Sequence, residues 1–184
     1  MATSERDKDL TADLRPEDRQ RSVQCIHLIA APNLADKHVI EGLTPTNHWR
    51  VFLELDKDAS VAVNMQYIAN SKNGKMVITS RDDAHTKFIA KHVEFKPVGS
   101  GIDHPVTVQD VIDVIITNGL HKYSFNNIGE GCRHWNLTLF EDLEKQGYIK
   151  KGSTDEARET LSYYWRENQP CKDPRPIQKG VFGM

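Results

Sequence analysis

The sequence predicts an α+β domain in which an antiparallel meander of strands is followed by three helices packed on one face of the sheet. Two observations support this class. From about residue 22 to 98, apolar residues alternate with a period of two, which is typical of half-buried strands. From about residue 107 to 168, apolar residues recur at helical spacing instead. Strands first and helices second, with one layer of each, is the pattern of an α+β domain.

The length and composition of the chain predict one domain in the cytoplasm. Its 184 residues fit a single domain, and 38% of them are hydrophobic. The formal net charge is −2 with acidic and basic residues interspersed, so we expect no nucleic-acid partner. No apolar run approaches the roughly 18 residues of a membrane span, and the N-terminus lacks the apolar core of a signal peptide. The sequence does not indicate an oligomeric state.

Three segments are expected along the chain. Residues 1–21 are dominated by charged and small polar side chains, which predicts a disordered N-terminal arm. Residues 22–168 are expected to form the single α+β domain. Residues 169–184 carry three prolines and two glycines, which predicts an extended C-terminal tail.

Five strands are expected in the first half of the domain. They cover residues 22–31, 47–55, 60–68, 75–79 and 87–98, and we expect them to form the meander. The second strand is the clearest, because Trp49 and Val51 begin an apolar face while His48 and Arg50 begin a more polar one. In the first strand, Cys25 is interpreted as a small core residue.

Three helices are expected after these strands. The first begins at Thr107, which can form a capping box with Asp110 three residues later. The second begins near Cys132, carries apolar residues at helical spacing, and ends at Gly147. The third is expected from about residue 154 to 168.

A glycine-punctuated loop leads directly into the second of these helices. Residues 126–135 read Asn-Asn-Ile-Gly-Glu-Gly-Cys-Arg-His-Trp, which places Cys132 in the first helical turn. There the unpaired backbone N–H groups and the positive end of the helix dipole favour an anion, so a thiolate forms more easily. Cys132 is therefore a candidate nucleophile, although a lone cysteine at a helix start is more often a small buried residue.

A thiol nucleophile needs a base within hydrogen-bond reach, and His48 is the candidate. It begins a rigid strand and lies on the more polar face of that strand. The returning strand carries Asn64 and Gln66, and the side-chain oxygen of either can accept the second ring N–H of His48. A slip of one residue in register brings Tyr67 opposite instead, so the third catalytic position stays open. A lone histidine on a strand is also often structural.

Two short motifs carry a resemblance to a known superfamily. They are Asn47-His48-Trp49 and Gly131-Cys132-Arg133-His134-Trp135. The histidine lies on an early strand, and the cysteine follows 132 − 48 = 84 residues later at a helix N-terminus. In this the chain resembles the circularly permuted papain-like superfamily, which includes the lecithin:retinol acyltransferase and H-Ras-like suppressor families, and is similar to the NlpC-type thiol enzymes. The resemblance spans about residues 22–145. The motif pair also resembles an uncharacterised group of fungal proteins.

The resemblance implies acyl-transfer chemistry on an amide, ester or thioester of a small molecule or peptide. Cys132 would form the acyl intermediate, with His48 as its base and Asn64 or Gln66 as the third member. Whether the acyl group passes to water or to another acceptor is left open. One departure is that Gly131 stands where those families usually have asparagine. Another is that the second histidine of those families has no counterpart unless one of the two amides substitutes for it.

Four further residues are candidates for contact with the substrate. Arg50 shares a face with His48 and can bind a carboxylate, although an arginine in this position is more often an exposed edge charge. Gly131 allows a substrate to approach the backbone, or simply makes the turn before the helix. His134 is two positions along the helix from the cysteine, so its side chain points about 200° away from that of Cys132. Trp49 is the fourth candidate, because it belongs to the strand motif Asn47-His48-Trp49.

The alternative to an enzyme is a protein that binds a small molecule by positioning alone, on the same papain-like frame. No metal site is expected, because the eight histidines are scattered and no His-x-His, His-x-x-x-His or His-Glu-x-x-His spacing occurs. No cofactor is expected either. The three cysteines are widely spaced without a Cys-x-x-Cys pair, which is a poor framework for disulfides.

Overall fold

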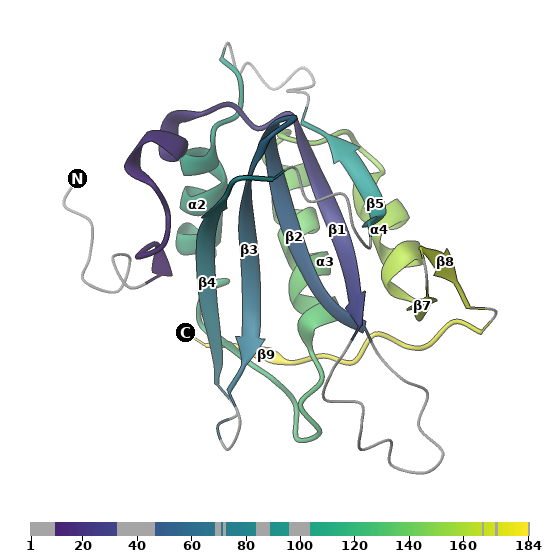
Figure 1. The fold of residues 1–184 in the computed structure, drawn as a ribbon. Helices are drawn as coiled ribbons and strands as arrows, with labels where there is room; N and C mark the ends of the chain where they lie inside the picture. The colour runs from purple at the N-terminus through teal and green to yellow at the C-terminus, as the bar shows by residue number, and fades with distance from the viewer. Residues whose placement is uncertain are drawn as a thin grey trace.

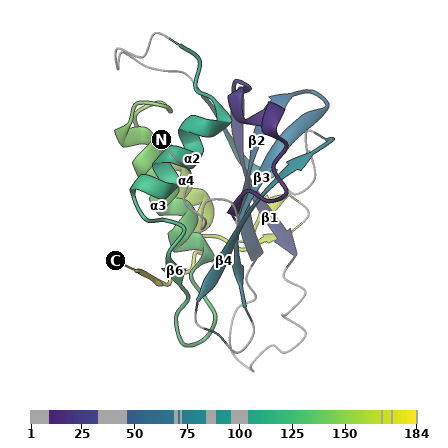
Figure 2. The same cartoon turned by 90° about the vertical axis from the view of Figure 1, so that its left-hand side faces the viewer.

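A five-stranded antiparallel sheet carries three helices on one face, which confirms the predicted α+β class (Figures 1 and 2). The computed structural model describes residues 10–32, 47–68, 71, 73–83, 89–95, 104–166, 168–171 and 173–183. The strands of the sheet are β1 (Cys25–Pro32), β2 (Asn47–Asp56), β3 (Ala59–Tyr67), β4 (Gly74–Arg81) and β5 (Ile89–Glu94). Within the described ranges, no helix is long and apolar enough to cross a membrane.

The strand order is β4-β3-β2-β1-β5, so only the first four strands form the predicted meander. β5 does not continue beside β4. It pairs with β1 at the opposite edge, where His27 lies across from His92. β1 is buried along nearly its whole length, and a strand in that position needs a neighbour on each side to satisfy its backbone groups. The chain therefore returns across the sheet before the helices begin.

The three helices are α2 (Val108–Thr117), α3 (Cys132–Lys145) and α4 (Ser153–Leu161). The capping box predicted for the first is present: the Thr107 hydroxyl accepts from the Asp110 N–H at 3.2 Å, and the Asp110 carboxylate accepts from the Thr107 N–H at 2.8 Å. α3 begins at Cys132, as predicted.

The third helix ends at Leu161, seven residues earlier than expected from the sequence (168 − 161). Just beyond it, the Trp165 N–H donates to Asn47 Oδ1 at 2.7 Å, and Asn47 Nδ2 donates to the Trp165 carbonyl at 2.8 Å. These bonds draw the chain away from helical geometry into β7 (Trp165–Arg166), which pairs with β8 (Gln169–Pro170). A contact across 118 residues of sequence therefore overrides the local helical pattern.

The core lies between the sheet and the helices. Odd-numbered residues of β2, including Trp49, Val51 and Leu53, face the helices and pack with Trp135 and Phe140 of α3. A second, smaller cluster lies on the opposite face of the sheet and contains Ile29, Ala31 and Phe52. The two faces of β2 thus differ sharply: one is the main core and the other carries the more polar side chains.

The first and last segments that the structure describes are both attached to this domain. Residues 10–21, expected to be disordered, instead contain the 3-10 helix η1 (Pro16–Gln20), whose Asp18 is only 1% exposed. The Asp18 carboxylate binds Arg15, Arg21 and the Ser80 hydroxyl, which anchors the arm to β4. Residues 1–9 of the expected arm lie outside the described residues.

The C-terminal segment is largely extended and returns along the helices. Its last strand, β9 (Val181–Phe182), pairs with β6 (Tyr123–Ser124), the short strand between α2 and α3. Ile177 and Phe182 pack against the main core. The segment therefore belongs to the domain, and it covers part of α3 (Figure 2).

Candidate functional site

The two motifs meet where the first turn of α3 rests on the beginning of β2. Cys132 Sγ lies 3.9 Å from the Asn47 carbonyl oxygen. Asn136, which is fully buried, donates from Nδ2 to the Cys132 carbonyl at 2.7 Å and to the Trp49 carbonyl at 3.3 Å. The contact between the motifs is thus made largely by backbone groups and by a buried amide, which fasten α3 to the sheet.

The thiol of Cys132 is held in its neutral form by its surroundings. Burial raises the pKa of the Cys132 thiol, and this effect outweighs the Trp49 N–H and the charge of Arg133, which act in the opposite direction. The start of a helix was expected to ease formation of the thiolate, but the sulfur packs against the core, where a charge is poorly solvated. Its position at the helix N-terminus therefore does not lower the pKa of the thiol.

His48 lies on the other face of the sheet. Its neighbours of the same parity, Arg50 and Phe52, contact one another there, with the guanidinium 5.6 Å from the ring centre. The odd-numbered residues Trp49 and Val51 point into the core beneath the helices. Because successive side chains of a strand point to opposite faces, the His48 ring is on the side away from Cys132. No hydrogen bond joins these two side chains in the part of the chain that the structure describes.

The hydrogen bond expected between His48 and β3 is formed. His48 Nε2 lies 3.1 Å from Asn64 Oδ1. Gln66, the other expected partner, is exposed near the end of β3, across from Lys75 of β4. The register of the two strands therefore pairs His48 with Asn64. This pair lies on the outer face of the sheet, away from Cys132.

The other residues expected to contact a substrate are distributed over both faces. Arg50 is partly buried beside His48, and its Nε is buried without a hydrogen-bond partner among the described residues. Trp49 is only 1% exposed, so it is a core residue rather than a substrate contact. Gly131 has a φ of 153°, and a Cβ there would lie 2.6 Å from the Tyr123 hydroxyl oxygen. Its missing side chain makes room for Tyr123, not for a substrate.

The stability of the fold should depend on pH through His48. Burial, and then the charge of Arg50, lower the pKa of His48 from its ordinary value of 6.5. The unfolded chain then binds more protons than the folded one, so stability is complete above about pH 6.5 and declines as the pH falls below it. We expect the free energy of unfolding, measured by urea titration between about pH 6.5 and pH 5, to decline less steeply in His48→Gln. Equal slopes in the two proteins would contradict this account of His48.

Tyr123 links the loop before α3 to the C-terminal segment. Its hydroxyl donates to the Gly131 carbonyl at 2.9 Å, accepts from the Gly180 N–H at 2.9 Å, and lies 3.2 Å from His134 Nδ1. Burial raises the pKa of Tyr123 far above its usual value, so the hydroxyl stays protonated. This network orients the His134 ring on the outer side of α3.

Arg133 is a buried cation that no sequence pattern singles out. It is 6% exposed and donates to the carbonyl oxygens of Leu161, Arg175 and Pro176, at 3.3, 3.2 and 2.9 Å. Glu130 lies 3.8 Å away and also pairs with Arg175. The three carbonyl groups are 28 to 43 residues away along the chain, so no local pattern reveals these hydrogen bonds.

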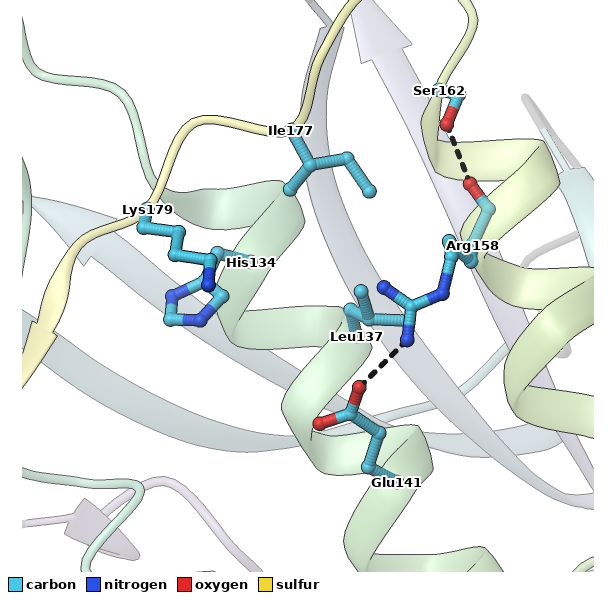
Figure 3. A pocket seen from close by; sticks show the side chains of 7 residues that line it. All are labelled: His134, Leu137, Glu141, Arg158, Ser162, Ile177 and Lys179. Atoms are coloured by element: carbon cyan, nitrogen blue, oxygen red, sulfur yellow. Dashed lines mark hydrogen bonds and ion pairs between the residues drawn. The ribbon is translucent and has the colours of Figure 1, made fainter.

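A pocket opens on the side of the helices away from the sheet, between α3, α4 and the C-terminal segment (Figure 3). Its volume is about 390 Å³, within the range of small-molecule sites. Its lining residues are His134, Leu137, Glu141, Arg158, Ser162, Ile177 and Lys179. Figure 3 shows Glu141 of α3 and Arg158 of α4 meeting across the gap, where they form an ion pair at 2.9 Å. Of the site residues expected from the sequence, only His134 lines this pocket.

The fold and these contacts define an α+β domain whose helices, on their outer side, form a small polar pocket with the C-terminal segment. The chain belongs to the family described as a domain of unknown function (DUF7770), whose model matches residues 26–183. The match includes the C-terminal segment as well as the sheet and helices. No curated protein and no solved structure matches the chain.

Proposed function

We propose that this domain binds a small organic molecule with an anionic group in the pocket between α3, α4 and the C-terminal segment. The observation that carries the proposal is the composition of that pocket. Leu137 and Ile177 supply apolar surface, while Arg158, Lys179 and His134 bring three basic groups to it against the single acidic residue Glu141. In a ligand site of this kind, the apolar side chains contact the hydrocarbon part of the ligand and the polar groups fix its orientation.

The electrostatics of the pocket favour an anion. The Arg158–Glu141 pair has side chains 50% and 45% exposed, and exposed pairs of this kind contribute only about 0–1 kcal/mol. Arg158 can therefore turn toward a carboxylate or phosphate at little cost and bind it through two N–H groups. Burial, and then the charge of Lys179, lower the pKa of His134, so at neutral pH its ring offers a hydrogen bond rather than a charge.

Acyl transfer through Cys132 is the competing hypothesis. It requires a thiolate and a base within hydrogen-bond reach. Burial raises the pKa of the Cys132 thiol, and His48 lies on the far face of β2. Cys132 is also absent from the lining of the pocket. Binding without turnover is therefore the function that this geometry supports better.

We also propose that the domain has the arrangement of the permuted papain-like superfamily. It is supported by the order of the elements, with the Asn47–Trp49 strand first and the cysteine helix packed against it later. The parity of β2 departs from what such an enzyme needs, because Trp49 takes the position that faces the helix. We propose a frame of this kind in which the residues of the two motifs serve packing.

A ligand screen tests the binding proposal. We expect saturation-transfer NMR with a panel of aryl and alkyl monocarboxylates to detect binders, and the matched neutral amides to give at least about tenfold weaker binding. Lys179→Glu should remove the binding, because it reverses the charge of a residue that lines the pocket. Lys57→Glu, at a side chain 89% exposed in the β2–β3 turn, is the matched control and should bind as the unchanged protein does. Equal binding of acids and amides, or equal loss in both variants, would contradict the proposal.

A further inference from the structure

The outer face of the sheet, away from the helices and the pocket, carries a compact group of metal-ligating side chains. Cys25 and His27 alternate along β1 and so point to the same face, and Glu54 of β2 lies directly across from Cys25. One ligand atom from each of the three lies within 4.8 Å of the other two. We propose that Cys25, His27 and Glu54 bind a zinc ion.

The geometry is close to that of a three-ligand zinc site. Zinc binds thiolate, imidazole and carboxylate at about 2.0–2.3 Å in a tetrahedral arrangement, which separates neighbouring ligand atoms by roughly 3.5 Å. His27 Nε2 and Glu54 Oε2 are now 2.5 Å apart and hydrogen-bonded to each other. Rotation of the two side chains by a small amount opens this pair, while the rigid pairing of β1 with β2 keeps the three residues in place.

The environment of His27 points to a ligand. The residue is only 8% exposed, and its Nδ1 is buried without a hydrogen-bond partner within the described ranges. Because the zinc ion would lie on the Nε2 side, next to Glu54, the unpaired Nδ1 is not itself evidence for the metal. Packing alone explains a small buried cysteine, but it does not explain a buried histidine whose ligand atom lies within 4.8 Å of both a thiol and a carboxylate.

The charges balance when zinc is bound. When zinc binds, the Cys25 thiol proton is released to solvent, and the three ligands are a thiolate, a neutral imidazole and a carboxylate. Two negative charges then meet one divalent cation, so the site is neutral in a poorly solvated position. The mixed sulfur, nitrogen and oxygen set suits zinc, whereas magnesium and calcium prefer oxygen ligands alone.

A fourth ligand stands close by. His92 of β5 is paired with His27 of β1, and the centres of the two rings are 6.2 Å apart. His92 is exposed, so either its ring or a water molecule can complete the tetrahedron. The sequence alone does not reveal this site, because Cys25 and His27 are close together in the chain whereas Glu54 and His92 come from two other strands.

Metal titration of the full chain after removal of metal by a chelator tests the site. We expect one equivalent of zinc per chain by calorimetry, and a thiolate-to-cobalt charge-transfer band when cobalt(II) replaces zinc. Cys25→Ser should remove the band and His27→Gln should lower zinc affinity at least about tenfold. Cys171→Ser, at a partly exposed cysteine elsewhere, is the control and should retain both. No zinc binding, or a band that persists in Cys25→Ser or is lost in Cys171→Ser, would overturn the assignment.

A second readout needs no substitution. Zinc should slow alkylation of Cys25 in the unchanged protein, with magnesium as the control ion, and the modified cysteine is identified by peptide mass spectrometry. A rate at Cys25 that is the same with zinc, with magnesium and without metal would overturn the proposal even where Cys25→Ser does not fold. Neither readout involves the pocket between α3 and α4, so the zinc site and the binding proposal stand or fall separately.

Discussion

Replacing Arg133 by alanine is expected to lower the free energy of unfolding by about 3–5 kcal/mol. The guanidinium is the only described cation that joins the start of α3 to both the end of α4 and the C-terminal segment. Its removal leaves three carbonyl oxygens without their donor, and each buried polar group left unpaired costs about 1–3 kcal/mol. It also takes one cation away from Glu130, which keeps only Arg175.

Urea denaturation followed by circular dichroism measures this loss. The matched control is Arg158→Ala, which breaks the exposed ion pair with Glu141 and should cost about 0–1 kcal/mol. If Arg133→Ala also lowers the free energy of unfolding by less than about 1 kcal/mol, the buried contacts of Arg133 do not hold the C-terminal segment on the domain as described. A loss of the expected size would show that Arg133, within the second motif, holds α3, α4 and the C-terminal segment together.

Much of the fold follows from local sequence patterns. Alternation identified the strands, and the capping box of Thr107 and the turn before Cys132 fixed the starts of two helices. The end of α4 was missed because Asn47 binds the backbone of Trp165, a contact that no short window of sequence contains. The return of β5 to the edge of β1 was missed for a similar reason, since pairing order depends on the whole sheet.

The alternation of side chains along β2 already indicates that His48 does not face Cys132. Trp49 and Val51 form the apolar side, and helices must cover that side because it is the one that buries surface. His48 has the opposite parity, so a cysteine on a covering helix cannot share its face. The similarity of the two motifs to those of thiol enzymes favoured a pair that the period of the strand does not allow.

The pocket lay beyond what the sequence could predict. Its lining comes from α3, α4 and the C-terminal segment, and their arrangement depends on Arg133 and Tyr123. Only His134 was singled out in advance, and for a different reason: it belongs to the cysteine motif. Sites built from three separated segments leave no fixed spacing in the chain.

The reactivity of Cys132 is the second large effect. Cys132 and Cys171 are both partly exposed residues, but burial raises the pKa of the Cys132 thiol and this residue packs against the core. We therefore expect alkylation of Cys132 to be at least about tenfold slower than that of Cys171. After unfolding in urea the two rates should converge, because the difference comes from the folded environment alone. Cys25, buried on the other face of the sheet, should also react slowly in the folded protein.

The most direct test of the structural role of the two motifs is therefore the rate of iodoacetamide labelling at each cysteine of the folded, metal-free protein. Peptide mass spectrometry at about pH 6, where ordinary thiols are almost fully protonated, separates an activated thiolate from a buried thiol. We expect iodoacetamide to label Cys132 more slowly than Cys171. Labelling of Cys132 faster than Cys171 at that pH would contradict it and would restore the cysteine as a nucleophile.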